Sequence, residues 1–242
     1  MDLMTTAWTA TAYTEFLADL QRQANLQAGQ RVKKIVVTDY PVLGISMREL
    51  KAMATKIAKG NPHEFLRLAG VDFYEVIIVR GYVLSQLKVD CRTLEHDLAE
   101  YLATADCWAI CDMAIHFKQV KRYPDEFLQV IRGYLAADNP WLQRTGLVFL
   151  LNFYLTETTW QTAIQLGMAV NSADYYVQMG QAWLLAAAYR THADAVLQLL
   201  RAGTSLKVAQ RTAQKIKSLT HTTIDQKAEL TAIIKKRKKD AR

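Results

Sequence analysis

Residues 106–112 read Asp-Cys-Trp-Ala-Ile-Cys-Asp, and the organisation of the chain can be worked out from this stretch. An Asp followed by an apolar run is typical of the start of a helix. Trp108 and Asp112 are four residues apart, so a helix places them on one face, one turn apart. A carboxylate beside a large aromatic in an apolar pattern is a local conflict, which natural proteins usually resolve by a salt bridge or by a function.

Helical patterns continue on the C-terminal side of this stretch. They are expected near 106–117, 124–136, 139–154, 158–170, 174–188, 191–201, 204–217 and 223–239. Residues of good N-cap type mark four of the starts, at Asp106, at Asp138 or Asn139, at Asp174 and at Ser205. These starts recur roughly every 31–35 residues, each followed by a partner helix. Helical pairs of this period predict an all-α solenoid with a concave face, and a helical bundle is the competing architecture.

The N-terminal side is also predicted to be helical. Helices are expected over 10–25, from Ser46 to about Ala58, over 72–86 and over 90–103. Ser46 with Glu49 three residues later predicts a capping box, and Pro62 suits the first turn of a short helix. The run 76–79, Val-Ile-Ile-Val, could form a buried strand, but its length and its helical neighbours favour helix.

The composition bounds the fold and the class of partner. The chain has 242 residues, 51% of them hydrophobic, which is enough for a substantial core, and its 4 Pro and 10 Gly leave few breaks in the helices. A formal charge of +7 favours an anionic partner, with nucleic acid ahead of an acidic membrane, although a solvated lysine surface gives the same number. The sequence has no apolar run of about 18 residues, so no membrane span is predicted.

The three cysteines indicate a reduced environment. Their number is odd and the N-terminus shows no secretory signal, so a cytoplasmic location is expected. Cys107 and Cys111 are four residues apart, but a metal site would need two more ligands, and His116 alone does not complete a set. Two buried thiols are therefore the favoured interpretation. The sequence predicts no metal, nucleotide or redox cofactor.

Three stretches place polar or aromatic side chains where the repeat pattern predicts the concave face. They contribute Trp108 with Asp112, Trp141 with Arg144, and Trp183; Lys207 and Arg211 follow in a later helix. Arg144 interrupts an apolar run, so its guanidinium must be paired or reach a groove. From the residues alone, tryptophans packed between repeats and a structural Asp–Arg ion pair are the simpler interpretation.

Four segments resemble the AlkD-type DNA alkylation repair family. They are CWAICD at 107–112, NPWLQR at 139–144, YYVQMGQAW at 175–183 and, near the N-terminus, LGI at 43–45 followed by MREL at 47–50. The resemblance extends over roughly residues 13 to 235, and the order and spacing of the segments agree with it. It implies a right-handed solenoid of HEAT-like helical pairs whose concave, basic face wraps duplex DNA. Residues 1–242 would then form one domain, with N-terminal helices at 1–45, repeats at 46–217, and a C-terminal helix and basic tail at 218–242.

The resemblance also implies an activity and roles for four residues. Members of the family are glycosylases that hydrolyse the N-glycosidic bond of cationic N3- or N7-alkylated purines without turning the base into a deep pocket. Asp112 matches the catalytic carboxylate, Trp108 and Trp183 match tryptophans that line the deoxyribose, and Arg144 matches an arginine that grips the adjacent phosphate. A carboxylate can stabilise the oxocarbenium-like sugar and orient the attacking water.

Basic residues suit a track for DNA phosphates. Those expected to contact the backbone are Lys118, Lys207, Arg211 and Lys215. The dense basic run 235–239 is either a further DNA contact or a solvated helix end whose cations suit the helix dipole. The expected partner is duplex DNA with alkylated purines, bound by a monomer.

A non-catalytic alternative stays open. Active members of the family carry an N-terminal helix with an aromatic and basic residues that probes the lesion. The corresponding residues 23–37 have no Tyr, Phe or Trp and offer Arg31, Lys33 and Lys34. A related branch keeps the solenoid without that helix, so a HEAT-like member that binds DNA or protein without catalysis is the second hypothesis. A pure protein-binding scaffold is the third.

Overall fold

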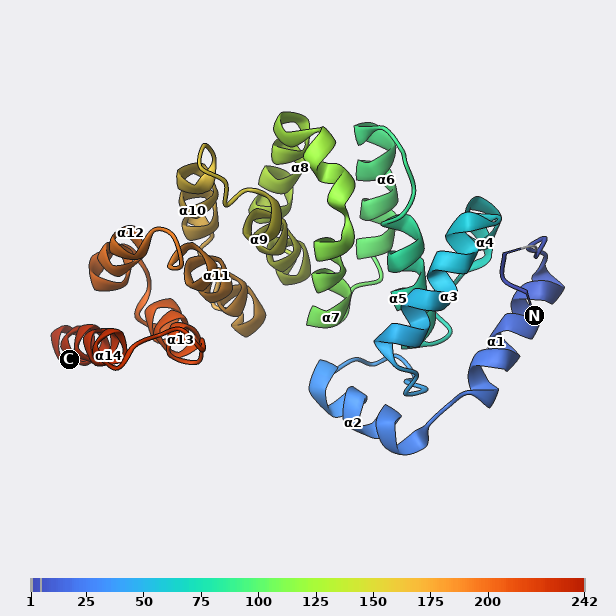
Figure 1. Ribbon diagram of the computed structural model, residues 1–242, viewed down its shortest axis with the longest axis horizontal. Coiled ribbons are helices and arrows are strands. Elements are labelled where there is room, and N and C mark those ends of the chain that lie inside the picture. Colours follow the sequence, from blue (N-terminus) through green and yellow to red (C-terminus); the bar gives the residue numbers. More distant parts are fainter. Residues whose placement is uncertain (1, 5, 242) are drawn as a thin grey trace. The chain divides into compact units, whose positions relative to one another are not determined.

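The computed structural model describes residues 2–4 and 6–241, and every regular element in them is helical (Figure 1). This confirms the predicted all-α class. The chain divides into two compact units, one ending at Phe127 and the next beginning at Leu128. We call them unit 1 and unit 2. None of the helices in the described part combines the length and apolar character needed to cross a bilayer.

Unit 1 contains the first helices of the chain. Their bounds are α1 Ala10–Arg22, α2 Leu26–Val36, α3 Met47–Lys59, α4 Pro62–Leu68, α5 Tyr74–Leu84, α6 Cys91–Leu102, α7 Trp108–Cys111, η1 Asp112–His116 and η2 Lys118–Arg122, and α8 Pro124–Ala136 spans the unit boundary. Trp8, Phe16 and Phe65 form an edge-to-face aromatic core, with the Trp8 and Phe65 ring centroids 4.9 Å apart. This core joins α1 to α4, so the N-terminal helix belongs to the packed body of unit 1.

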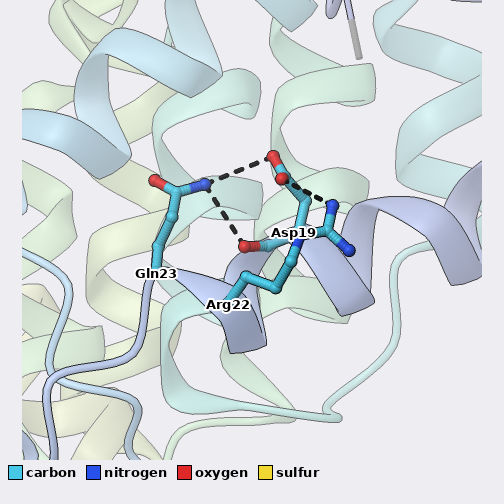
Figure 2. A network of polar contacts seen from close by, with 3 residues as sticks. All are labelled: Asp19, Arg22 and Gln23. Carbon is cyan, nitrogen blue, oxygen red and sulfur yellow. Dashed lines mark hydrogen bonds and ion pairs between the residues drawn. The ribbon is translucent and has the colours of Figure 1, made fainter.

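The end of α1 is closed by a polar network. Figure 2 shows Gln23 reaching back to Asp19, where its Nε2 donates to the backbone oxygen at 3.3 Å and to the carboxylate at 3.2 Å. Arg22 donates to the same carboxylate at 2.9 Å. The network is exposed, so it adds little to stability, but it satisfies a terminal carbonyl of α1 just before α2 begins.

Local signals set the boundaries of α3, α4 and α5. The capping box of Ser46 with Glu49 is present, and Pro62 is the first residue of α4. The run 76–79 is helical and lies inside α5, which is buried along nearly its whole length. A helix buried on all sides has no polar face, which explains why this run could not be told from a buried strand by its pattern.

The loop between α2 and α3 is held by a buried carboxylate. Glu75, which is 1% exposed, accepts hydrogen bonds from the backbone N–H groups of Leu43 (3.0 Å) and Gly44 (2.7 Å). Gly44 has a φ of 85°, and a Cβ there would collide with the backbone of Asn25 and Gly29. Only glycine combines this conformation with so close an approach, so the loop is fixed against α2 and α5.

The stretch 106–112 differs in detail from the prediction. Asp106 is not an N-cap: Cys107 occupies that position without a side-chain cap. The Asp106 carboxylate instead accepts hydrogen bonds from Thr38 Oγ1 at 2.6 Å and from the Asp39 N–H at 2.8 Å. The Asp106 carboxylate therefore binds a segment distant in the sequence instead of capping the helix that follows it. The predicted single helix is a short α7 that tightens into the 3₁₀ turns of η1 at Asp112.

Unit 2 contains the remaining helices. They are α9 Pro140–Phe153, α10 Trp160–Ala169, α11 Tyr175–Ala188, α12 Ala193–Gln198, the π turn η3 Leu199–Gly203, α13 Leu206–Lys217 and α14 Ile224–Asp240. The predicted N-caps Asn139, Asp174 and Ser205 are confirmed, each accepting from a backbone N–H of the first turn. The central helix α11 packs against both α9 and α13 (Figure 1). This packing decides where the candidate side chains of unit 2 lie.

Candidate functional site

The candidate residues of unit 1 lie where α7 passes into η1. Asp112 donates its backbone N–H to the Trp108 carbonyl, which keeps the two side chains one turn apart. Both side chains are half-buried, whereas Cys107, Ile110 and Cys111 are fully buried in the core. Burial raises the pKa of the Cys107 thiol to about 12, so it is a neutral core residue, as favoured from the sequence. The inner face of this turn is structural, and Trp108 and Asp112 form its accessible side.

Trp108 is fixed by a hydrogen bond that the sequence did not indicate. Its indole Nε1–H donates to the Ile35 carbonyl of α2 at 3.1 Å. The Tyr40 hydroxyl donates to the Thr104 carbonyl at 2.9 Å and joins the same two segments a second time. The partners are 73 and 64 residues apart, so no local pattern could have revealed them. The result is that α2 and the candidate tryptophan hold each other in place.

A second group lies at the end of η1. The rings of His116 and Tyr82 are in contact, with centroids 4.7 Å apart, and Lys51 Nζ lies 6.0 Å from the Tyr82 centroid. Lys118, predicted to contact the DNA backbone, is exposed and begins η2. Burial, Lys51 and Lys118 lower the pKa of His116 below its ordinary value. Unit 1 therefore offers a neutral imidazole between two lysines, four residues after Asp112.

This shift predicts a pH-dependent loss of stability. Because the folded pKa of His116 is lowered, the unfolded chain takes up a proton first as the pH falls toward the ordinary value of about 6.5. The free energy of unfolding should therefore decrease from pH 7.5 to pH 5.5, and His116→Gln should make the decrease smaller. Urea denaturation at both pH values measures this. His63→Gln, at an exposed histidine of α4, is the matched control, and an equal effect of both variants would contradict the assignment.

The candidate residues of unit 2 meet around Trp183 on α11. The Arg144 guanidinium carbon lies 5.3 Å from the Trp183 ring centroid, and Lys215 Nζ lies 4.6 Å from it. Arg144 also donates from Nη1 to the Tyr176 carbonyl at 3.0 Å and is only 2% exposed. Two cations therefore lie beside one indole, one of them buried and the other half-buried. These residues are candidates from their sequence, but no sequence pattern predicts the pairing of Lys215 with Trp183.

The other two basic candidates of unit 2 lie apart from the Trp183 ring. Arg211 stacks on Tyr175, with the guanidinium carbon 4.8 Å from the ring centroid, and is hydrogen-bonded to Gln178 Oε1. Tyr175 itself is 54% exposed, an unusual exposure for a tyrosine, and the sequence analysis did not select it as a site residue. Lys207 is exposed on the first turn of α13 and lines an open groove with Asn171. Of the four basic candidates of unit 2, Arg144 and Lys215 lie beside Trp183, Arg211 lies beside Tyr175, and Lys207 lines the groove.

The chemistry available in these residues is electrostatic. Unit 1 offers a carboxylate beside an indole, which suits a cationic sugar, and unit 2 offers cations beside indole and phenol rings, which suit phosphate. Among the described residues, no group of three or more His, Cys, Asp and Glu is arranged to hold a metal ion.

The comparisons with known proteins agree with the family resemblance of the sequence. The family described as DNA alkylation repair enzyme matches residues 16–224, which is most of the 242-residue chain. No curated protein matches the chain at a significant level. The matched range includes Trp108 and Asp112 of unit 1 and Arg144, Trp183 and Lys215 of unit 2. The chain belongs to the DNA alkylation repair enzyme family.

Proposed function

We propose that the protein is a DNA glycosylase that removes cationic N3- and N7-alkylated purines from duplex DNA. The observation that carries the proposal is the half-buried Asp112 held one turn from Trp108 in a member of this family. An alkylated purine is already positively charged, so it leaves as a neutral base and needs little help from an acid. The remaining task is to stabilise the sugar as the glycosidic bond breaks.

Asp112 is suited to that task. Its negative charge stabilises the oxocarbenium-like sugar, and its oxygens can orient the water that attacks C1′. The face of the Trp108 ring adds an attraction for positive charge of about 1–2 kcal/mol where water is excluded. The bond between C1′ and the ring nitrogen breaks, water adds at C1′, and the proton of the water is released. No deep base pocket is required, in contrast to glycosylases that flip the base.

Phosphate binding is the proposed role of the basic residues. Lys118 in unit 1 and Lys207 in unit 2 are exposed, and Arg211 and Lys215 are half-buried beside aromatic rings. Because so little of Arg144 is exposed, its contact with a phosphate requires neighbouring side chains to move. Its partners in the structure include the Tyr176 carbonyl and the Trp183 ring. The helical pairs and their period support a right-handed HEAT-like α-solenoid, with residues 1–242 as one domain, as the architecture that presents these groups.

The structure of α2 bears on the choice between the glycosylase and the non-catalytic DNA-binding protein. Residues 26–36 form a helix, although they contain no aromatic residue, and the end of this helix is bonded to Trp108. A helix with basic residues therefore lies where the probing helix of active members is expected, without the aromatic residue, and its end is hydrogen-bonded to a candidate site residue. This favours the glycosylase over the non-catalytic DNA-binding protein.

Base release from methylated duplex DNA tests the proposal. We expect the wild-type protein to release 7-methylguanine or 3-methyladenine, measured by chromatography of the free base. Affinity for an unmodified duplex, measured by fluorescence anisotropy, should fall steeply between 50 and 200 mM salt, and Lys207→Ala should reduce the slope by about one unit. No release at tenfold enzyme excess would sink the glycosylase. Retained, salt-dependent affinity would then support the non-catalytic DNA-binding protein, and its absence the protein scaffold.

A further inference from the structure

A cavity of about 290 Å³ lies among the helices α4, α5 and α6 of unit 1. The helix α5 packs against both α4 and α6 (Figure 1). Each helix contributes residues three or four positions apart, so each presents one face to the cavity. The volume lies at the small end of the range for ligand pockets, which limits an occupant to a small molecule. None of the residues that line it is a candidate for catalysis or for DNA binding.

The charged groups that line the cavity are divided between its walls. Arg67 and Arg80 come from α4 and α5, whereas the carboxylates of Asp97 and Glu100 come from α6. His63 of α4 adds a group that is cationic only when it is protonated. Two positive and two negative groups therefore balance near neutral pH. Such a lining does not favour a simple anion or a simple cation, but it suits a small molecule that carries both charges.

Arg80 has hydrogen-bonding capacity that the protein leaves unused. Its Nε is buried without a hydrogen-bond partner, and its Nη1 donates to the Gly70 carbonyl at 3.4 Å, which is long for such a bond. Within residues 2–4 and 6–241, no carboxylate forms an ion pair with Arg80. The acid of the same loop, Asp72, accepts from the Tyr13 hydroxyl at 2.5 Å instead. A half-buried guanidinium of this kind is stabilised by an acceptor that a ligand supplies.

Asp97 lines the same cavity without a counter-ion. It is half-buried, and no cation in the described part of the chain forms an ion pair with it. Burial raises the pKa of its carboxyl above the ordinary value; His96 and His63 oppose this effect, and Glu100 adds to it. Glu100 itself is exposed and lies 3.5 Å from the His96 ring nitrogen. An ammonium group beside Asp97 would stabilise the charged form of its carboxyl.

We propose that the cavity binds a free α-amino acid with an apolar side chain. The ligand carboxylate contacts the guanidinium groups of Arg67 and Arg80, and its ammonium group contacts Asp97. Leu66 and Leu84 form the apolar part of the lining, against which an aliphatic side chain packs. An α-amino acid carries these three kinds of group on one carbon, which matches the three kinds of lining. The inference goes beyond the proposed function, because it involves no DNA and no candidate site residue.

L-Leucine is the probe, together with two analogues that each lack one charged group. The first is 4-methylpentanoate, which has no ammonium group, and the second is 3-methylbutylamine, which has no carboxylate. Isothermal titration calorimetry with the whole protein, without DNA and near neutral pH, should show saturable binding of L-leucine. Each analogue should bind at least about tenfold more weakly, because a charged contact is lost.

Two variants assign the charged contacts. Arg80→Gln should narrow the preference for L-leucine over 3-methylbutylamine, because both ligands then lack the guanidinium contact. Asp97→Asn should narrow the preference for L-leucine over 4-methylpentanoate. A general loss of structure would weaken all three ligands alike, so the pattern across the ligands reports the contacts themselves. Arg92→Gln and Glu95→Gln, at exposed residues of α6, are the matched controls and should change none of the affinities.

The outcomes also separate this inference from the glycosylase activity. No saturable binding of L-leucine by the wild-type protein up to about 10 mM overturns the proposal. Equal affinity for L-leucine and either analogue overturns it as well, since one charge would then suffice. Unchanged preferences in both Arg80→Gln and Asp97→Asn would place the bound amino acid elsewhere on the protein and have the same consequence. Release of methylated bases is measured without amino acid, so the failure of one proposal leaves the other standing.

Discussion

Replacement of Asp112 with Asn is expected to lower the rate of 7-methylguanine release by about 10²- to 10³-fold, the effect typical of removing one preorganised electrostatic group. Asn keeps the size of Asp but has no charge to stabilise the cationic sugar. Binding of unmodified duplex should remain within about threefold of the wild-type value, because phosphate contacts supply most of that affinity. Single-turnover kinetics on methylated duplex, together with anisotropy, measures both quantities.

The control for this variant is Asp125→Asn, which removes one exposed carboxylate from the first turn of α8. It causes the same change in net charge as Asp112→Asn and should leave the release rate within about twofold, since surface charges are screened by salt. Equal rates for wild type and Asp112→Asn would show that the carboxylate is structural. A loss of DNA affinity as large as the loss of rate would lead to the same conclusion.

Replacement of Glu75 with Ala is expected to lower the free energy of unfolding by about 3 kcal/mol or more. The change leaves two backbone N–H groups, those of Leu43 and Gly44, without the carboxylate that they share at 2.7–3.0 Å. Each buried donor without a partner costs about 1–3 kcal/mol. The lost packing of the side chain adds to this cost. Urea denaturation followed by circular dichroism measures the change.

Two further variants make the Glu75 result specific. Glu95→Ala, at an exposed glutamate of α6, should change the free energy of unfolding by no more than about 0.5 kcal/mol. Glu75→Gln keeps an oxygen acceptor and should fall between the wild-type protein and Glu75→Ala. A cost below about 1 kcal/mol for Glu75→Ala would mean that water replaces the carboxylate, and the loop would not depend on it.

The loop held by Glu75 also supports α2. The Asn25 N–H at the start of α2 donates to the Leu43 carbonyl at 2.8 Å, so loosening the loop loosens this end of α2. The other end is held independently by Trp108 and Asp106.

Most helices could be predicted from the sequence because their signals are local. The Ser46 cap and its Glu49 partner lie within one turn, as do Asn139, Asp174 and Ser205 with the N–H groups that they accept. The apolar spacing between such caps indicates helix without any knowledge of what the helix packs against. The family was also accessible from the sequence, and the family match over residues 16–224 confirms it.

The tertiary structure alone decided how the candidate site is supported. The same residue type, Asp, caps a helix at Asp174 but binds a distant segment at Asp106, and the sequence does not distinguish the two uses. The bond between Trp108 and Ile35 joins an indole to a backbone carbonyl, an acceptor that every residue has, so no residue type signals it. The left-handed backbone of Val37, with a φ of 55°, likewise arises only where the chain must turn back toward Asp106. The sequence by itself determined most of the helices and the chemical groups that they carry. Long-range hydrogen bonds determined which of those groups are held rigid. Such bonds depend on the geometry of the folded chain, so the local sequence pattern does not reveal them.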